Sequence, residues 1–244
     1  MGVRDRHAAG AGAWSGGTPL PRKGSGGQTR SVRVEPVGPE VLEAVLVERI
    51  MGRGAEQGAD RRLRVLLDGA ATTGPGALAD ALVDPLRAAG RAAVRVSAED
   101  FLRPASLRWE HGRHAPTAFL EDRLDVAALR REVLDPFGPA GDGRYLPSLW
   151  DAERDRATRA PYARAPTGAV LLLDGSMLLG RGLDAELRVH LSVRADTLSR
   201  RLPDAERWTL PAYARYEERM RPRDEADVLV LVDDPRRPAL VVRL

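Results

Sequence analysis

Two acidic residues stand at the ends of apolar runs, and a glycine-rich turn follows the first of them. Asp68 follows the run RVLL, and Asp174 follows the run AVLLL. Buried parallel strands read as continuous apolar runs, and their carboxyl ends border the ligand crevice of open α/β sheets. The turn from Gly69 to Gly76 (GAATTGPG) has the two-glycine spacing of a phosphate-binding loop. In such a loop, backbone N–H groups and a helix N-terminus face the phosphate. These residues therefore predict phosphate chemistry at a sheet edge.

The two reactive positions of this loop carry unusual residues. Pro75 occupies the lysine position and Gly76 the Ser/Thr position. Proline removes the point charge on the β/γ-phosphates and one N–H donor, and glycine removes the magnesium ligand. Thr72 or Thr73 could supply a hydroxyl to a metal instead. The alternative interpretation is a simple turn, with proline in the first helical turn and glycine for close packing.

The elements around the loop alternate between helix and strand. Asp125 is a good N-cap for its helix, whereas His190 is interpreted as a core or edge histidine of a strand and Tyr216 as a packing residue. The alternation predicts a three-layer α/β/α P-loop NTPase-like domain with a mainly parallel sheet. Apolar periodicity predicts helices over 39–52, 77–89, 126–134, 195–202 and 211–221, and strands over 64–67, 93–96, 169–173, 189–193 and 228–232.

Composition divides the chain into a tail over 1–35 and a domain over 36–244. The tail is rich in Gly and Arg and lacks apolar periodicity, which predicts disorder. The tail holds six of the 38 basic residues and two of the 35 acidic ones, so the domain carries 32 basic and 33 acidic residues. A nearly neutral domain does not indicate nucleic-acid binding. Because no apolar run approaches the ~20 residues of a membrane span, we expect a cytoplasmic protein with no membrane partner. The oligomeric state stays open, and a homo-oligomer is compatible with the sequence.

From about residue 62 to 240 the sequence resembles the uridine kinase/phosphoribulokinase branch of P-loop kinases, particularly actinobacterial members, with a degenerate loop. The resemblance implies phosphoryl transfer from ATP, with Mg²⁺, to a nucleoside or sugar hydroxyl. It is carried by a succession of segments in the family's order: LLDGAATTGPGALADAL, VRVSAEDFLRP, FLEDRLDVAALRREVLDPFGP, YLPSLWD, VLLLDGSMLL and ADVLVLVDDPRRP.

The resemblance also implies roles for individual residues. Glu99 takes the place of the family's proton-accepting acid, and the adjacent Asp100 could substitute for it. Asp174 is similar to the magnesium-side carboxylate, and Arg200 and Arg201 stand in the place of lid arginines. The implied substrate pocket contains Phe101, Arg103, Asp125, Trp150 and Asp151, and the implied phosphate cradle contains Gly69, Thr72, Thr73, Gly74 and Gly76.

Two hypotheses follow from these residues. The first is a uridine/nucleoside kinase-like phosphotransferase, slow or altered because of Pro75 and Gly76. The second is a catalytically silent nucleoside- or nucleotide-binding protein (a pseudokinase), acting as a sensor or partner-binding protein. The retained acids favour the phosphotransferase, and Pro75 and Gly76 in the loop favour the binding protein.

Overall fold

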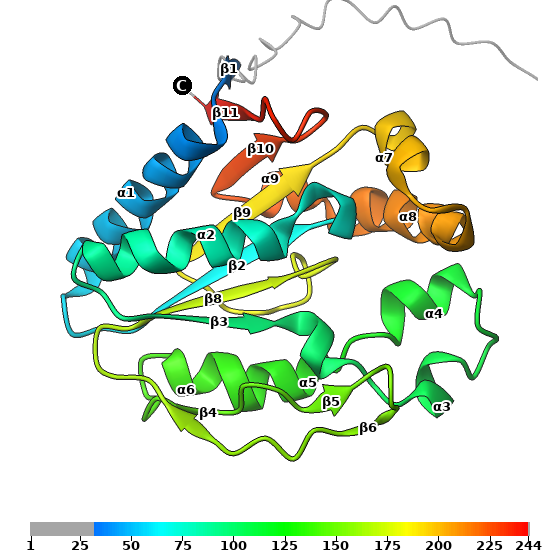
Figure 1. Cartoon of the computed structure of the whole chain (residues 1–244), viewed down its shortest axis with the longest axis horizontal. Coiled ribbons are helices and arrows are strands. Elements are labelled where there is room, and N and C mark those ends of the chain that lie inside the picture. The colour runs from blue at the N-terminus through cyan, green and yellow to red at the C-terminus, as the bar shows by residue number, and fades with distance from the viewer. Residues whose placement is uncertain (1–31, 244) are drawn as a thin grey trace, which may run out of the picture. The chain divides into compact units, whose positions relative to one another are not determined.

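A mostly parallel sheet forms the centre of the molecule (Figure 1). The computed structural model describes residues 32–243, and seven strands within this range form one sheet in the order β1-β11-β10-β9-β2-β8-β3. The five strands from β10 to β3 are parallel, whereas β11 is antiparallel to both β10 and β1. The predicted fold class is confirmed. The strands are β1 (Val32–Pro36), β2 (Leu63–Gly69), β3 (Ala93–Ser97), β8 (Val170–Gly175), β9 (Leu187–Ser192), β10 (Val228–Leu231) and β11 (Ala239–Arg243).

Helices cover both faces of the sheet, which gives three layers (Figure 1). Successive side chains of a strand point to opposite faces, so Leu66 and Leu67 belong to different cores. On one face, α1 (Pro39–Gln57) and α2 (Pro75–Ala88) pack on the sheet. On the other face the sheet is covered by α5 (Val126–Leu129), a π-helical turn η3 (Arg130–Leu134) and α6 (Asp135–Phe137).

Short elements gather beyond the carboxyl ends of the strands. Helices α7 and α8 lie at that end of the sheet, together with α3 and α4 (Figure 1). The short helices are η1 (Ala71–Thr73), η2 (Ala98–Phe101), α3 (Ala105–Arg108), α4 (Pro116–Glu121), α7 (Ala195–Arg201), η4 (Asp204–Thr209), α8 (Leu210–Met220) and α9 (Pro222–Glu225). Two small hairpins pair β4 (Arg144–Tyr145) with β7 (Ala163–Arg164) and β5 (Trp150–Asp151) with β6 (Arg156–Ala157).

The start of the ordered domain differs from the predicted boundary. Residues 32–35, assigned to the tail from their composition, belong to β1, in which Val34 pairs with Val241 of β11. The two strands are distant in sequence, so periodicity alone did not reveal either of them. The remainder of the predicted tail, 1–31, lies outside the described residues. No helix in the described part of the chain is both long and apolar enough to cross a membrane.

Candidate functional site

The loop after β2 needs both of its predicted glycines. A Cβ on Gly69 would lie 2.5 Å from Thr73 Oγ1 and 2.9 Å from the carbonyl oxygen of Leu191. Only glycine therefore lets this end of β2 approach β9 so closely. Gly74 has φ of 75°, a left-handed conformation that favours glycine. The backbone outline predicted from the glycine spacing is thus present.

The loop nevertheless presents few donors to a phosphate. The N–H group of Thr73 donates to the carbonyl of Ala70 at 2.8 Å, and the N–H group of Gly74 donates to the carbonyl of Ala71 at 3.1 Å. The Thr73 hydroxyl donates to the carbonyl of Ala70 at 2.7 Å. Pro75, the first residue of α2, has no N–H. Three consecutive residues therefore bring no free N–H group to the helix N-terminus. Thr72 Oγ1 is buried and has no hydrogen-bond partner within residues 32–243.

An arginine that sequence reasoning passed over occupies the space beside Gly76. Arg95 of β3 donates from Nε to Asp174 Oδ1 at 2.7 Å and from Nη2 to Oδ2 at 3.2 Å. Its Nη1 donates to both carboxylate oxygens of Asp80 on α2, at 2.8 and 2.9 Å. A Cβ on residue 76 would lie 2.6 Å from Arg95 Nη2 and 3.1 Å from Asp174 Oδ2. The hydrogen bond to Asp174 is the main cause that raises the pKa of Arg95, so the guanidinium stays charged.

This arrangement does not fit a magnesium ion. Mg²⁺ takes oxygen ligands in near-octahedral geometry, but both carboxylate oxygens of Asp174 already accept from Arg95. The Asp174 side chain is 6% exposed, and Gly76 offers no hydroxyl. Among residues 32–243, no group of three or more His, Asp or Glu side chains is placed to hold a metal. Asp174, the predicted magnesium ligand, is instead a buried carboxylate paired with the partly exposed guanidinium of Arg95.

The two adjacent acids after β3 have different surroundings. Glu99 is exposed and forms an ion pair with Arg123. Asp100 is half-buried and accepts a hydrogen bond from Ser148 Oγ at 3.3 Å. Burial is the main cause that raises the pKa of Asp100; the nearby Asp174 adds to it, and the hydrogen bond from Ser148 opposes it. The structure thus brings Asp100, the alternative acid, into electrostatic contact with the Asp174 pair.

Two residues of the predicted substrate pocket have structural contacts. Phe101 is fully buried in the core under the sheet, so its ring does not reach a solvent-accessible pocket. Asp125 caps α5, as the sequence predicted, because its Oδ1 accepts from the N–H of Ala128 at 2.8 Å. The cap uses one carboxylate oxygen of Asp125.

The remaining predicted pocket residues are held by local partners. Trp150 Nε1 donates to Asp155 at 3.1 Å. Asp151 accepts hydrogen bonds from the backbone N–H and from the side chain of Arg154. These hydrogen bonds lower the pKa of Asp151, and the backbone one has the larger effect. Arg103 forms an ion pair with Asp122 at 3.2 Å. These contacts fix the hairpin and the α3–α4 region.

The two predicted lid arginines form hydrogen bonds with residues close to their own helix, α7. Arg201 donates to the carbonyls of Val232 and Asp233 at the end of β10, at 2.8 and 2.6 Å. Arg200 donates to Thr197 Oγ1 on the same helix at 3.2 Å. Arg201 is therefore occupied in joining α7 to the sheet.

A buried network that the sequence did not reveal lies beside the loop. Asp68 is fully buried and accepts from His190 Nδ1 at 2.7 Å, from the Tyr216 hydroxyl at 2.9 Å and from the Leu178 N–H at 2.8 Å. Burial alone would lower the pKa of His190, but Asp68 and the carboxylate of Glu217 outweigh it and raise the pKa to about 9. The partners come from β2, β9, α8 and the loop after β8. The strand register pairs Asp68 with His190, and the packing of α8 and of the loop after β8 brings Tyr216 and Leu178 to the same carboxylate.

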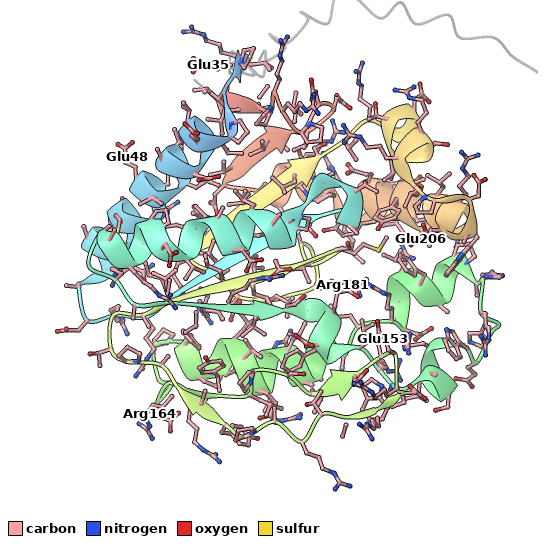
Figure 2. The ribbon with its side chains drawn as sticks, in the orientation of Figure 1. Glu35, Glu48, Glu153, Arg164, Arg181 and Glu206 are labelled. Carbon is pink, nitrogen blue, oxygen red and sulfur yellow. The ribbon has the colours of Figure 1, made fainter. Side chains whose placement is uncertain are left out.

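The loop after β8 is joined to α4 by a half-buried arginine, Arg181. Figure 2 shows Arg181 between the end of the sheet and α4. Its Nε donates to the carbonyl of Met177 at 2.5 Å, and its Nη2 donates to the carbonyl of Leu120. Met177 is buried with φ of 62°, a conformation uncommon for a side chain of this size. This contact fixes the loop that carries the Leu178 N–H to Asp68.

Comparison with known proteins gives a consistent result for the fold. Neither a family model nor a curated protein matches the sequence. Among solved structures, a "Possible Uridine Kinase" from Bacillus stearothermophilus aligns with a TM-score of 0.63 and 17% identity over 78% of this chain and 97% of its own. A proposed fructose transport system kinase from Silicibacter sp. TM1040 gives 0.54 and 23% identity over 76% and 89% of the two chains. The YGR205w protein gives 0.61 and 10% identity over 85% and 99%.

The mostly parallel sheet with helices on both faces matches the fold of these neighbours. The chain has a P-loop kinase-like fold.

Proposed function

We propose that this protein is a binding member of the uridine kinase-like fold group, which holds a nucleoside- or sugar-like small molecule and does not catalyse ordinary Mg²⁺–ATP phosphoryl transfer. The observation that carries the proposal is the Arg95 guanidinium, which spans from Asp174 to Asp80 beside Gly76. Phosphoryl transfer depends almost wholly on positioned charges around the phosphates. Here the lysine is absent, the N–H groups of Thr73 and Gly74 are engaged, and the magnesium-side carboxylate is neutralised.

The region that would hold the ligand hydroxyl keeps an acidic side chain, whereas the phosphate-binding loop has lost its lysine and its Ser/Thr. Asp100 lies at the carboxyl edge with a raised pKa and one hydrogen bond, from Ser148. Two of the structural neighbours are named for uridine and fructose transport, which supports a polyhydroxylated ligand as the chemical class. A carboxylate at this position would accept a hydrogen bond from a ligand hydroxyl whether or not phosphate is transferred.

A second function, an active but slow phosphotransferase, is favoured by Asp100 as well. A half-buried carboxyl with a raised pKa is suited to accept a proton from a hydroxyl. In that case Arg95 would supply the charge that lysine and magnesium supply elsewhere, although its planar fork is a different donor from a lysine ammonium.

Calorimetry and an ADP-release assay separate the two functions. We expect uridine, cytidine, ribose or fructose to bind without ATP, and ADP release with ATP–Mg²⁺ to stay at the buffer rate. Asp100→Asn should weaken ligand binding about tenfold, the effect of one hydrogen bond to a charged group. Asp84→Asn, on the exposed face of α2, is the matched control. Rapid ADP release that Asp100→Asn abolishes would contradict the binding proposal, and so would the absence of any bound sugar or nucleoside.

A further inference from the structure

A cavity of about 560 Å³ lies between α7, α8 and the carboxyl end of β9. Its walls are mainly apolar, and its volume falls in the ~300–1,000 Å³ range of small-molecule sites. Arg95, Asp174 and Asp100 do not line it. The apolar lining includes Met177, Leu191, Val193, Leu198, Leu210 and Pro211.

One buried nitrogen in the cavity wall makes no hydrogen bond within the described residues. His190 is 3% exposed, and its Nδ1 is held by Asp68 at 2.7 Å. Its Nε2 has no hydrogen-bond partner within residues 32–243. Buried polar groups are nearly always hydrogen-bonded, because an unmet donor costs free energy. The Asp68 contact fixes the ring. Because the raised pKa keeps His190 protonated at pH 7, Nε2 also carries a hydrogen, which a ligand acceptor can take.

An acceptor lies next to this donor. Glu217 Oε1 is 3.4 Å from His190 Nε2, an ion pair that does not meet hydrogen-bond geometry. Glu217 Oε2 is 3.3 Å from Arg223 Nε. Burial acts to raise the pKa of Glu217, but His190 and Arg223 together lower it. The carboxylate therefore stays ionised and can accept from a ligand N–H.

The charged side chains that line the cavity balance. They are His190 and Arg223, which are positive, and Asp196 and Glu217, which are negative; Asp68 lies behind His190. Moving an unpaired charge into an apolar cavity is costly, which favours an uncharged ligand. Because donor and acceptor are adjacent at one end of an apolar space, they fit the edge of a ring that carries both complementary groups.

We propose that this cavity binds a small, planar, uncharged heterocycle in which a ring carbonyl adjoins a ring N–H. The carbonyl accepts from His190 Nε2, the N–H donates to Glu217, and the apolar walls enclose the ring. The site lies apart from Asp100 and does not depend on the proposed function.

Isoquinolin-1(2H)-one and its N-methyl derivative test the proposal. The parent compound carries the adjacent carbonyl and N–H, and the derivative lacks only the donor. We expect saturation-transfer NMR with the full chain to show binding of the parent, with a shift of the His190 side-chain nitrogen resonances. The derivative should bind about tenfold more weakly, since one charge-assisted hydrogen bond is lost. No binding of the parent, or equal affinity of the two compounds, would overturn the proposal.

Two variants locate the site. Glu217→Gln should weaken the parent compound about tenfold, whereas Glu218→Gln, one residue along on the exposed face of α8, should not. Ala214→Trp should fill the cavity and abolish binding, while Ala214→Ser retains it. Binding that survives both Glu217→Gln and Ala214→Trp is at another place and refutes the assignment. Asp100→Asn should leave the heterocycle bound while impairing the sugar or nucleoside, so the two proposals fail separately.

Discussion

At the scale of single residues, Arg95 has the largest consequence for function. It projects from a strand in which its neighbours Val94 and Val96 pack apolar surface, and it contacts carboxylates from two other elements. The Arg95 side chain is partly exposed; of its two partners, Asp174 is buried and Asp80 is exposed. Removing one partner of a buried ion pair leaves an uncompensated charge, which is more costly than loss of an exposed pair.

Arg95→Met should therefore lower the free energy of unfolding by about 2–4 kcal/mol at pH 7. Urea unfolding at pH 7 measures the loss. The control is Arg87→Met, whose ion pair with Asp84 is well exposed and should contribute less than about 0.5 kcal/mol. Equal losses for the two variants would show that the Arg95 bridge does not stabilise the fold.

His190 gives a second residue-scale prediction, on pH. Its pKa of about 9 in the folded protein exceeds the ~6.5 of an unfolded chain. Protonation therefore favours folding, and the contribution is complete below pH 6.5 and is lost as the pH rises through 9. The difference corresponds to about 3 kcal/mol. Unfolding free energies between pH 6 and 9.5 should fall accordingly in the wild type, but much less in Asp68→Asn.

The exposed histidine His111 provides the control for this measurement. His111→Gln should retain the full pH dependence of the wild type, because that side chain is exposed. An NMR titration that places the His190 pKa near 6.5 would contradict the Asp68–His190 account.

At the scale of elements, β1 is the strand that the composition had assigned to the tail. Its five residues pair with β11 and cover the edge that β11 would otherwise expose. Edge strands with unpaired N–H and C=O groups are open to pairing with other chains. The strand should therefore contribute both stability and resistance to aggregation.

Deleting residues 1–36 should lower the melting temperature, whereas deleting 1–31 should change it little, as the composition of that segment predicts. If the strand contributes about 2 kcal/mol, the expected fall is about 4–8 °C for a domain of this size. Differential scanning calorimetry of the two truncated chains, with light scattering for aggregation, measures the difference. Identical melting temperatures would show that β1 is dispensable.

At the scale of the whole molecule, the loop, β3 and β8 form one site and have to be changed together. From the sequence, Pro75→Lys with Gly76→Thr is expected to restore nucleotide binding. The structure adds a condition, because a side chain at residue 76 meets the Arg95 guanidinium. The guanidinium can move only by giving up its ion pair with Asp174.

The triple change Pro75→Lys, Gly76→Thr, Arg95→Ser should therefore bind ATP–Mg²⁺ about tenfold or more tightly than the double change, since it frees one preorganised charge contact. Calorimetry with and without Mg²⁺ gives the comparison, and the wild type is expected to show no Mg²⁺ dependence. Equal binding by the double and triple variants would mean that Arg95 does not obstruct the site.

The sequence by itself determined the layer architecture and the outline of the loop. Apolar runs such as the one before Asp174 can be buried on both faces only in a covered parallel sheet. Gly69 and Gly74 mark positions where the backbone excludes a side chain, and Asp125 marks a helix start. These features depend on local periodicity and local backbone geometry, which are set by residues close together in the sequence.

The tertiary structure alone decided which side chains share the site. Arg95, Asp80 and Asp174 come from β3, α2 and β8, and the register of β3 on β8 sets the contact between Arg95 and Asp174. Asp68 and His190 meet in the same way across β2 and β9. A charged side chain within a strand reads the same in sequence whether it faces solvent or a carboxylate on a neighbouring element. Its partner is fixed by strand order and register, which follow from the packing of the whole domain.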